Sequence, residues 1–159
     1  MNYNPSTISR IADINLGIRV DKASIAIAGI STKSLFNVIG GRVLVRALIG
    51  EVTVAIQDQA NAAKFRLTPT SGAVADMCGA GATQNMALYG LISCPCTLAN
   101  TALNVTTTTG TGCVPGPQNG GVVCAAGVIG LNTAADNTGE MKFSVWYVPI
   151  DEGAYVEAA

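Results

Sequence analysis

The chain has 159 residues, of which 49% are hydrophobic and 12% are charged, and its formal net charge at pH 7 is −1. This composition argues against disorder, which requires low hydrophobicity and high net charge, and it lacks the basic surplus of a nucleic-acid-binding protein. Between Leu67 and Thr138 the only charged residues are Asp76 and Asp136, and the chain has no histidine, so acid–base, metal and phosphate chemistry has few side chains to use.

The N-terminal half alternates apolar and polar residues as half-buried strands do. Residues 1–13 are polar, include Pro5 and are expected to form an N-terminal arm. Gly40-Gly41 and Gly50 are predicted to separate strands, and a turn is predicted after Leu67. The predicted strands cover residues 24–28, 35–39, 42–49, 51–58 and 64–67. Within 42–49, alternation places on one face Val43, Val45, Ala47 and Ile49.

The middle of the chain is less regular. Residues 73–82 show no clear period, and residues 85–92 and 103–109 are candidate strands. Residues 110–121 are rich in glycine and proline and are predicted to form a loop. The apolar run 122–131 is predicted to be one strand with a bulge, because it combines Val and Ile with internal glycines.

The last predicted strand covers residues 142–148, with Phe143, Val145 and Tyr147 on one face, and an acidic C-terminal tail over 150–159 follows it. No amphipathic helix of convincing length is apparent. The short strands predict an all-β fold, a single-domain antiparallel sandwich or jelly-roll-like barrel over residues 1–159 with Gly/Pro/Thr-rich loops.

Insertion into a membrane is not predicted. A spanning helix needs about 20 consecutive apolar residues, and the best candidate, residues 122–135, is shorter and is interrupted by Asn132. Arg10 and Asp13 interrupt the N-terminus, so no signal-peptide core is expected and synthesis in a cytoplasm is the default. We therefore expect the mean hydropathy of +0.40 to reflect surface that is buried in an oligomer or larger assembly.

All cysteines fall in the charge-poor stretch: Cys78, Cys94, Cys96, Cys113 and Cys124. An odd number leaves at least one thiol unpaired in a monomer. The favoured interpretation is buried reduced thiols, as in a protein made in a reducing cytosol, and the second is one or two disulfides formed later in an oxidising medium. A metal site is the least favoured, because Cys94-Pro95-Cys96 lacks the CxxC spacing of zinc sites and no histidine is available. No cofactor is predicted.

No catalytic constellation stands out in the sequence. Serine and cysteine nucleophiles lack a histidine base, and adjacent carboxylates occur only in the tail, at Asp151-Glu152. A Ser–Lys dyad has no support from spacing with any of Lys22, Lys33, Lys64 or Lys142. The chain is therefore not expected to be an enzyme, and a small hydrolase using a thiol or a Ser–Lys pair is kept as a third hypothesis.

Two separated parts of the sequence stand out, residues 34–45 with 48–53 and the C-terminal segment 146–154. These segments resemble a small virion protein of tailed bacteriophages. The resemblance implies a capsid decoration, or cement, protein: a β-rich homotrimer that is made in the host cytoplasm and binds the phage major capsid protein on the outside of the head. Neither a nucleic acid nor a membrane is expected as a partner, because the charge and the apolar runs described above favour neither. The candidate contact residues are then the basic side chains Arg42, Arg46, Lys64 and Arg66.

An alternative is a head-fibre or tail-associated binding module that recognises a host surface glycan or protein. The Thr- and Gly-rich loops of the middle region would present its site. Such a module needs an exposed aromatic residue, and Tyr89 is the only aromatic residue in the neutral stretch.

Overall fold

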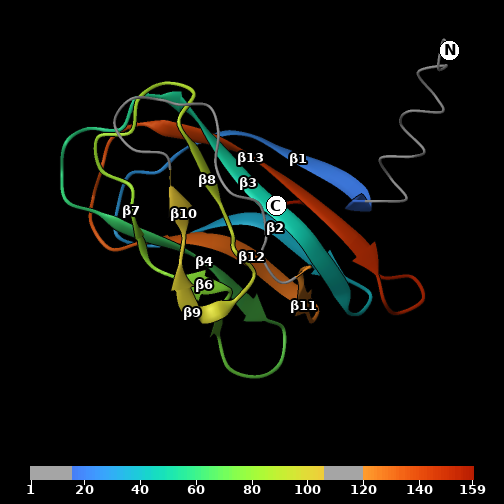
Figure 1. Ribbon diagram of the computed structural model, residues 1–159. Helices are drawn as coiled ribbons and strands as arrows, with labels where there is room; N and C mark the ends of the chain where they lie inside the picture. The colour runs from blue at the N-terminus through green and yellow to red at the C-terminus, as the bar shows by residue number, and fades with distance from the viewer. Residues whose placement is uncertain (1–15, 106–119) are drawn as a thin grey trace, which may run out of the picture.

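The chain forms a sandwich of two antiparallel β-sheets in a computed structural model that describes residues 16–105 and 120–159 (Figure 1). Sheet A contains β1 (Ile18–Ala26), β3 (Val43–Val54), β8 (Leu91–Ser93), β10 (Asn104–Val105), β11 (Val122–Cys124) and β13 (Glu140–Pro149). Its strand order is β1-β13-β3-β8-β10, and β11 also pairs with β3.

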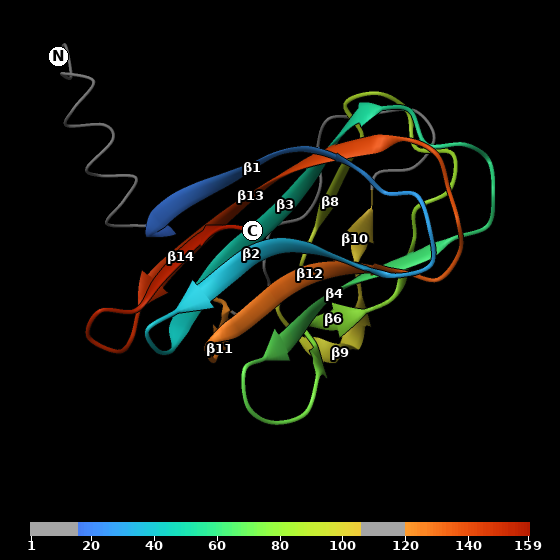
Figure 2. The same ribbon diagram turned by 180° about the vertical axis from the view of Figure 1, so that it is seen from behind.

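Sheet B contains β2 (Thr32–Ile39), β4 (Ala62–Pro69), β5 (Ala75–Asp76), β7 (Gly81–Ala82), β12 (Gly127–Thr133) and β14 (Tyr155–Ala158). Its strand order is β14-β2-β12-β4-β5, and β7 also pairs with β4. A parallel pair, β6 (Cys78–Gly79) and β9 (Leu98–Ala102), lies beside the sheets. Figures 1 and 2 show β1, β13 and β3 in one layer and β2, β12 and β4 in the other. The predicted all-β antiparallel sandwich is therefore confirmed.

Several sequence predictions fall outside the described residues. These are the N-terminal arm over 1–13, most of the strand predicted over 103–109, most of the loop predicted over 110–121, and Cys113. Within the described residues, no helix is long and apolar enough to cross a lipid bilayer.

The core lies between the inner faces of the two sheets. Phe143 and Val145 reach it from β13, and Phe36 and Phe65 reach it from β2 and β4, all with at most 1% of their surface exposed. The rings of Phe65 and Phe143 meet edge to face, with centroids 6.3 Å apart and planes at 84°, which is a favourable geometry for an aromatic pair. Tyr147 is also buried, so the shared face predicted for Phe143, Val145 and Tyr147 is confirmed, and it faces the core.

The prediction that Gly50 separates two strands is wrong, because β3 runs through it without interruption. A Cβ atom on Gly50 would lie 2.8 Å from Cε1 of Phe143 and 2.9 Å from Cγ1 of Ile92. The glycine is therefore required by close packing under an aromatic ring rather than by a turn.

The prediction that Ile49 lies on the same face of the strand as Val43 is also wrong. The register of β3 on β13 shifts between Ala47 and Val45, and Arg46 is the extra residue of this bulge. A bulge reverses the alternation beyond it. Leu48, not Ile49, is consequently the next fully buried side chain.

The apolar run 122–131 is two strands rather than the single bulged strand predicted. Val122–Cys124 is β11 in sheet A, and the strand that begins at Gly127 is β12 in sheet B, between β2 and β4. The chain passes from one sheet to the other at Ala125 and Ala126. A Cβ atom on Gly127 would lie 2.4 Å from the carbonyl oxygen of Thr68, so this crossing admits only glycine without rearrangement.

Two smaller differences concern the middle and the end of the chain. Of the candidate strand over 85–92, only its last residues belong to a strand, β8. The acidic tail contains a strand that the sequence does not predict: β14 pairs with β2, with Tyr155 opposite Ile39. Val156 and Ala154 are buried at 4% and 5% exposure, so the C-terminus is part of the sandwich.

Candidate interaction surface

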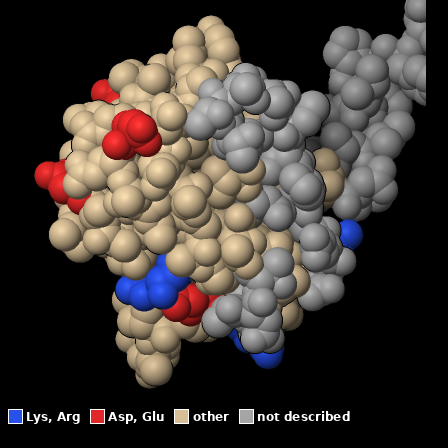
Figure 3. Space-filling view, turned by 60° about the vertical axis from the view of Figure 1, so that its left-hand side comes forward, with Lys and Arg blue, Asp and Glu red and all other residues tan. Residues whose placement is uncertain are grey.

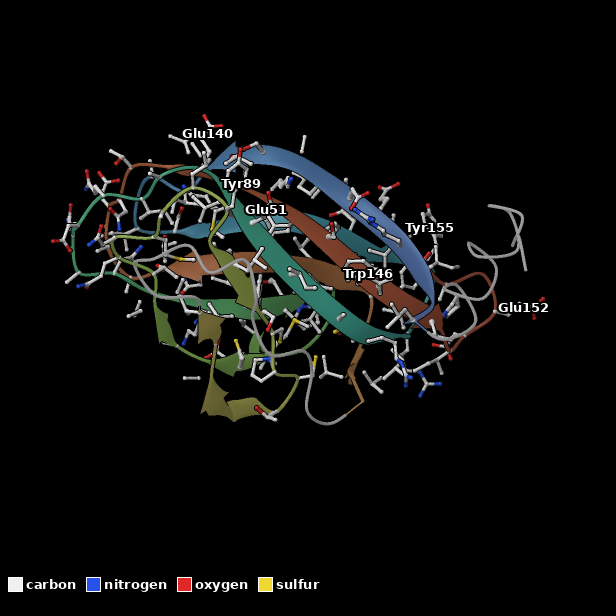
Figure 4. All side chains as sticks on the ribbon, turned by 45° about the horizontal axis from the view of Figure 1, so that its top comes forward. Glu51, Tyr89, Glu140, Trp146, Glu152 and Tyr155 are labelled. Atoms are coloured by element: carbon white, nitrogen blue, oxygen red, sulfur yellow. The ribbon has the colours of Figure 1, made fainter. Side chains whose placement is uncertain are left out.

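The segments 34–45 and 146–154 lie side by side at one end of the sandwich, which we call the hairpin end (Figure 1). There the β2–β3 turn meets the β13–β14 connection. The amide N–H of Ile150 donates to the carbonyl of Arg42 at 3.0 Å, and the amide of Arg42 donates to Oδ2 of Asp151 at 2.6 Å. Glu152 lies at the tip of this end (Figure 4).

Arg42 binds Asp151 with its side chain as well as its backbone. Its Nη2 donates to Oδ1 at 2.7 Å and its Nε donates to Oδ2 at 3.0 Å, which is the bidentate arrangement that a guanidinium favours. These hydrogen bonds, first from the side chain and then from the backbone, hold the pKa of Asp151 at about 2, below its ordinary value of 3.8. Arg42 therefore ties the hairpin end together, and its exposed side chain stays available to a partner.

Substitution of Asp151 by asparagine is expected to lower stability in a pH-dependent way. Because the pKa of Asp151 is lower in the folded chain, its contribution is fully present well above pH 3.8 and is lost as the pH falls toward about 2. Urea unfolding midpoints of the wild type and D151N should differ near neutral pH and converge in acid. E152Q, at the exposed neighbour, should follow the wild type, and a D151N difference that persists unchanged in acid would exclude this linkage.

Lys64 and Arg66 share a single carboxylate. They precede and follow Phe65 in β4, and Asp76 lies opposite Arg66 on β5. Lys64 Nζ lies 2.6 Å from Oδ2 of Asp76, and Arg66 Nε lies 2.8 Å from Oδ1. Burial raises the pKa of Asp76, but the hydrogen bonds from the two cations outweigh burial and lower it. Lys64, Arg66 and Asp76 together thus carry a net positive charge, and each of the three side chains is 26% exposed.

Arg46 differs from the other three candidate contact residues. It occupies the bulge of β3 and is partly exposed. Among the residues that the structure describes, no carboxylate forms an ion pair with it, whereas Arg42, Lys64 and Arg66 are all paired. Bulges often re-aim a side chain, which leaves this guanidinium free for a partner.

Asp76 and Asp151 bind three of the candidate contact residues, and the sequence analysis did not select them for this role. For Asp76 a signal existed, because a lone acidic residue follows two alternating basic residues across one predicted turn. For Asp151 there was no local signal, because it lies 109 residues from Arg42.

Three exposed apolar side chains lie at the other end of β3 and in the segment before β8: Val54, Leu88 and Tyr89, which are 50%, 44% and 63% exposed. The segment before β8 is fixed to β3: the amide of Tyr89 donates to the carbonyl of Val52 at 3.0 Å, and Met86 is 1% exposed. Tyr89 has φ of 65°, a left-handed conformation that costs a non-glycine residue of order 1 kcal/mol. Figure 4 shows Tyr89 with Glu51 and Glu140, far from Glu152.

One broad face of the molecule carries little charge (Figure 3). Acidic atoms appear near its upper and left margins, and a mixed basic and acidic group appears near its lower part.

A hollow of about 440 Å³ lies beside β1 and β13. Its polar lining consists of Arg19, Asp21, Lys22, Ser24, Lys142 and Ser144. Ser144 donates to Asp21 at 2.5 Å, Ser24 donates to Glu140 at 3.1 Å, and Lys142 pairs with Glu51 at 3.0 Å. The serines of this hollow are thus bonded to carboxylates, whereas a Ser–Lys dyad requires a serine bonded to a lysine amine.

Four of the five cysteines lie together in the core as free thiols: Cys78, Cys94, Cys96 and Cys124. The described residues contain no group of three or more His, Cys, Asp or Glu side chains arranged to hold a metal ion.

No protein-family model, no curated protein and no solved structure matches this chain.

Proposed function

We propose that the protein is a structural component of a tailed-bacteriophage virion, a decoration protein that binds the major capsid protein lattice on the outside of the head. In this proposal it is made in the host cytoplasm, acts as a homotrimer, stabilises the head and performs no catalysis. The observation that supports it most is the position of the segments that resemble a phage virion protein. Although about a hundred residues separate 34–45 from 146–154, they form one continuous part of the fold, linked by Arg42 and Asp151.

The surface is consistent with a role in binding protein. Side chains such as Val54, Leu88 and Tyr89 expose apolar area on a chain in which only 12% of residues are charged. An interface with another protein would bury this apolar area. A three-fold assembly buries one such surface per subunit, and a repeating lattice adds avidity to each weak contact.

The proposal is tested by adding the purified protein to mature heads that lack it. The wild type should sediment with the heads and raise the temperature at which they release their DNA. R46E should bind at least about tenfold more weakly, because it reverses the charge on the unpaired guanidinium. K33E, which makes the same charge change on sheet B, is the matched control and should bind as the wild type does. Failure of the wild type to bind either mature or immature heads would reject the proposal.

The trimer is tested separately by light scattering in the presence of reductant. A native mass of three times 16.2 kDa is expected. A monomer at the concentrations used for head binding would contradict the homotrimer and leave the exposed apolar side chains without a symmetric partner.

A second candidate function is supported by the exposure of Tyr89. An aromatic ring held outward by a fixed backbone is suited to stacking on a glycan or anchoring a surface protein. In that case the protein would be a head-fibre or tail-associated module, and fluorescently labelled wild type would stain intact host cells while Y89A would not. Head binding without cell staining would favour the decoration protein.

A further inference from the structure

The hollow beside β1 and β13 lies where the edge strand β1 departs from regular pairing. Asp21 is opposite Ser144 and Lys22 is opposite Phe143, but the register then shifts before Ile25. A bulge bends the strand that contains it, and the lining of the hollow includes the residues of this bulge. Its volume of about 440 Å³ falls within the range of about 300–1,000 Å³ that is typical of small-ligand sites.

Arg19 is held in place at one side of this hollow. Its Nε donates to Oδ1 of Asp21 at 2.8 Å, and its Nη2 donates to Oγ of Ser144 at 3.5 Å. Its guanidinium carbon lies 5.2 Å from the ring centroid of Trp146, on the strand between β1 and β3 (Figure 4). Such a cation–aromatic contact is attractive. Because Arg19 covers the ring, Trp146 supports the guanidinium and is not itself a stacking platform.

Asp21 is held by the same network. Ser144 donates to its Oδ1 at 2.5 Å, and this oxygen also accepts the hydrogen bond from Arg19. The hydrogen bond from Ser144, supported by that from Arg19, outweighs burial and lowers the pKa of Asp21. At neutral pH this side chain is therefore a carboxylate, which only accepts hydrogen bonds.

The network leaves polar atoms available to a ligand. Among the residues that the structure describes, none bonds to Oδ2 of Asp21 or to Nη1 of Arg19. The ammonium of Lys142 carries three donors and has one partner, Glu51, at 3.0 Å. The hollow thus offers donors and an acceptor on side chains that are already fixed, and fixed groups lose less conformational entropy when they bind.

The charge of the lining favours an anionic ligand. Three lining side chains are cations and one, Asp21, is a carboxylate. The cations are Arg19, Lys22 and Lys142. Glu51 and Glu140 lie outside the lining, where Glu51 pairs with Lys142 and Glu140 accepts a hydrogen bond from Ser24. A matching ligand therefore presents an anionic group to the cations and a hydrogen-bond donor to Asp21.

We propose that this hollow binds a saccharide that carries a carboxylate, such as a uronic or sialic acid. The saccharide carboxylate accepts a charge-assisted hydrogen bond from Nη1 of Arg19, and a ring hydroxyl donates to Oδ2 of Asp21. A neutral sugar lacks the first group, and a simple carboxylate ion lacks the second. The proposal goes beyond the virion function and does not depend on it.

The test uses the purified full-length chain and a matched pair of ligands. Methyl glucuronide and methyl glucoside differ only in a carboxylate against a hydroxymethyl group, and N-acetylneuraminic acid is a second acid. Trp146 is the single tryptophan of the chain, so its fluorescence reports on the hollow. At least one acid should change this fluorescence saturably with a Kd below about 1 mM, and the glucoside should bind at least about tenfold more weakly. Backbone amide NMR shifts should concentrate in residues 18–24 and 142–146.

Variants identify the groups that bind. R19Q and D21N should each weaken binding of the acid at least about tenfold in the NMR titration, whereas K33Q, which removes a positive charge on sheet B, should bind as the wild type does. Binding of neither acid below about 10 mM, equal binding of the glucoside, or shifts centred on Tyr89 would overturn the proposal. The wild-type titration decides the question even if a variant does not fold, and it uses no phage heads, so its result is independent of head binding.

Discussion

Substitution of Phe143 by alanine is expected to lower the free energy of unfolding by about 3–5 kcal/mol, the usual cost of removing a buried aromatic side chain. Phe143 is 1% exposed and meets the ring of Phe65 edge to face. It also packs over Gly50, where the absence of a Cβ atom makes room for it. The cavity would therefore open between the two sheets, where neighbouring strands cannot close it without moving apart. Urea unfolding followed by Trp146 fluorescence measures the change.

K142A is the matched control for F143A. Lys142 is the preceding residue on β13, points outward and forms an exposed ion pair with Glu51. Exposed pairs contribute about 0–1 kcal/mol, so K142A should change stability little. If F143A cost no more than K142A, the inner face assigned to β13 would be wrong.

Substitution of Gly127 by alanine should destabilise the protein by at least about 3 kcal/mol. The new methyl group would meet the carbonyl oxygen of Thr68 at 2.4 Å and Cα of Pro69 at 2.5 Å. Both atoms belong to the backbone of β4, so the clash can be relieved only by separating β12 from β4. Soluble yield and urea unfolding of G127A are the measurements.

The control for G127A is G153A. Gly153 has φ of 76°, and a Cβ atom there would meet nothing within 4 Å. Alanine at that position should cost only the backbone preference, about 1 kcal/mol. Equal destabilisation by the two variants would show that contact with β4 does not decide the effect at Gly127.

Strand alternation predicts the fold where one side of a strand faces the core throughout, as it does from Phe143 to Tyr147. It fails along β3, because a glycine under an aromatic ring has the same appearance in the sequence as a glycine in a turn. The bulge at Arg46 then reverses the alternation without any change in composition. Both features depend on β13, which is about a hundred residues away, so the local sequence does not contain them.

The run from Val122 to Leu131 illustrates a second reason. Its first part is a strand of sheet A and its second part is a strand of sheet B, and both are rich in apolar residues. Sequence alone does not distinguish this crossing between sheets from one long buried strand. The last strand, β14, is missed because Glu152 and Gly153 before it and Glu157 within it give the segment the composition of a solvated tail. Its pairing with β2 supplies the stability that its composition does not indicate.

Of the candidate contact residues, the sequence identifies the basic side chains but not their acidic partners. Asp151 meets Arg42 only because the β13–β14 connection returns to the β2–β3 turn. The cysteines likewise appear dispersed in the sequence, and the strands β6, β8 and β11 bring four of them together. Sequence analysis therefore predicts the basic side chains and the cysteines as residue types, whereas the topology determines which side chains meet.

The central claim is that this protein binds the outer surface of a phage head at repeating positions. A cryo-electron microscopy reconstruction of heads before and after addition of the purified protein tests it most directly. The proposal predicts new three-lobed density outside the shell at local three-fold positions, with the sandwich fitting each lobe. Heads whose density is unchanged by the protein, or added density confined to the tail, would contradict it.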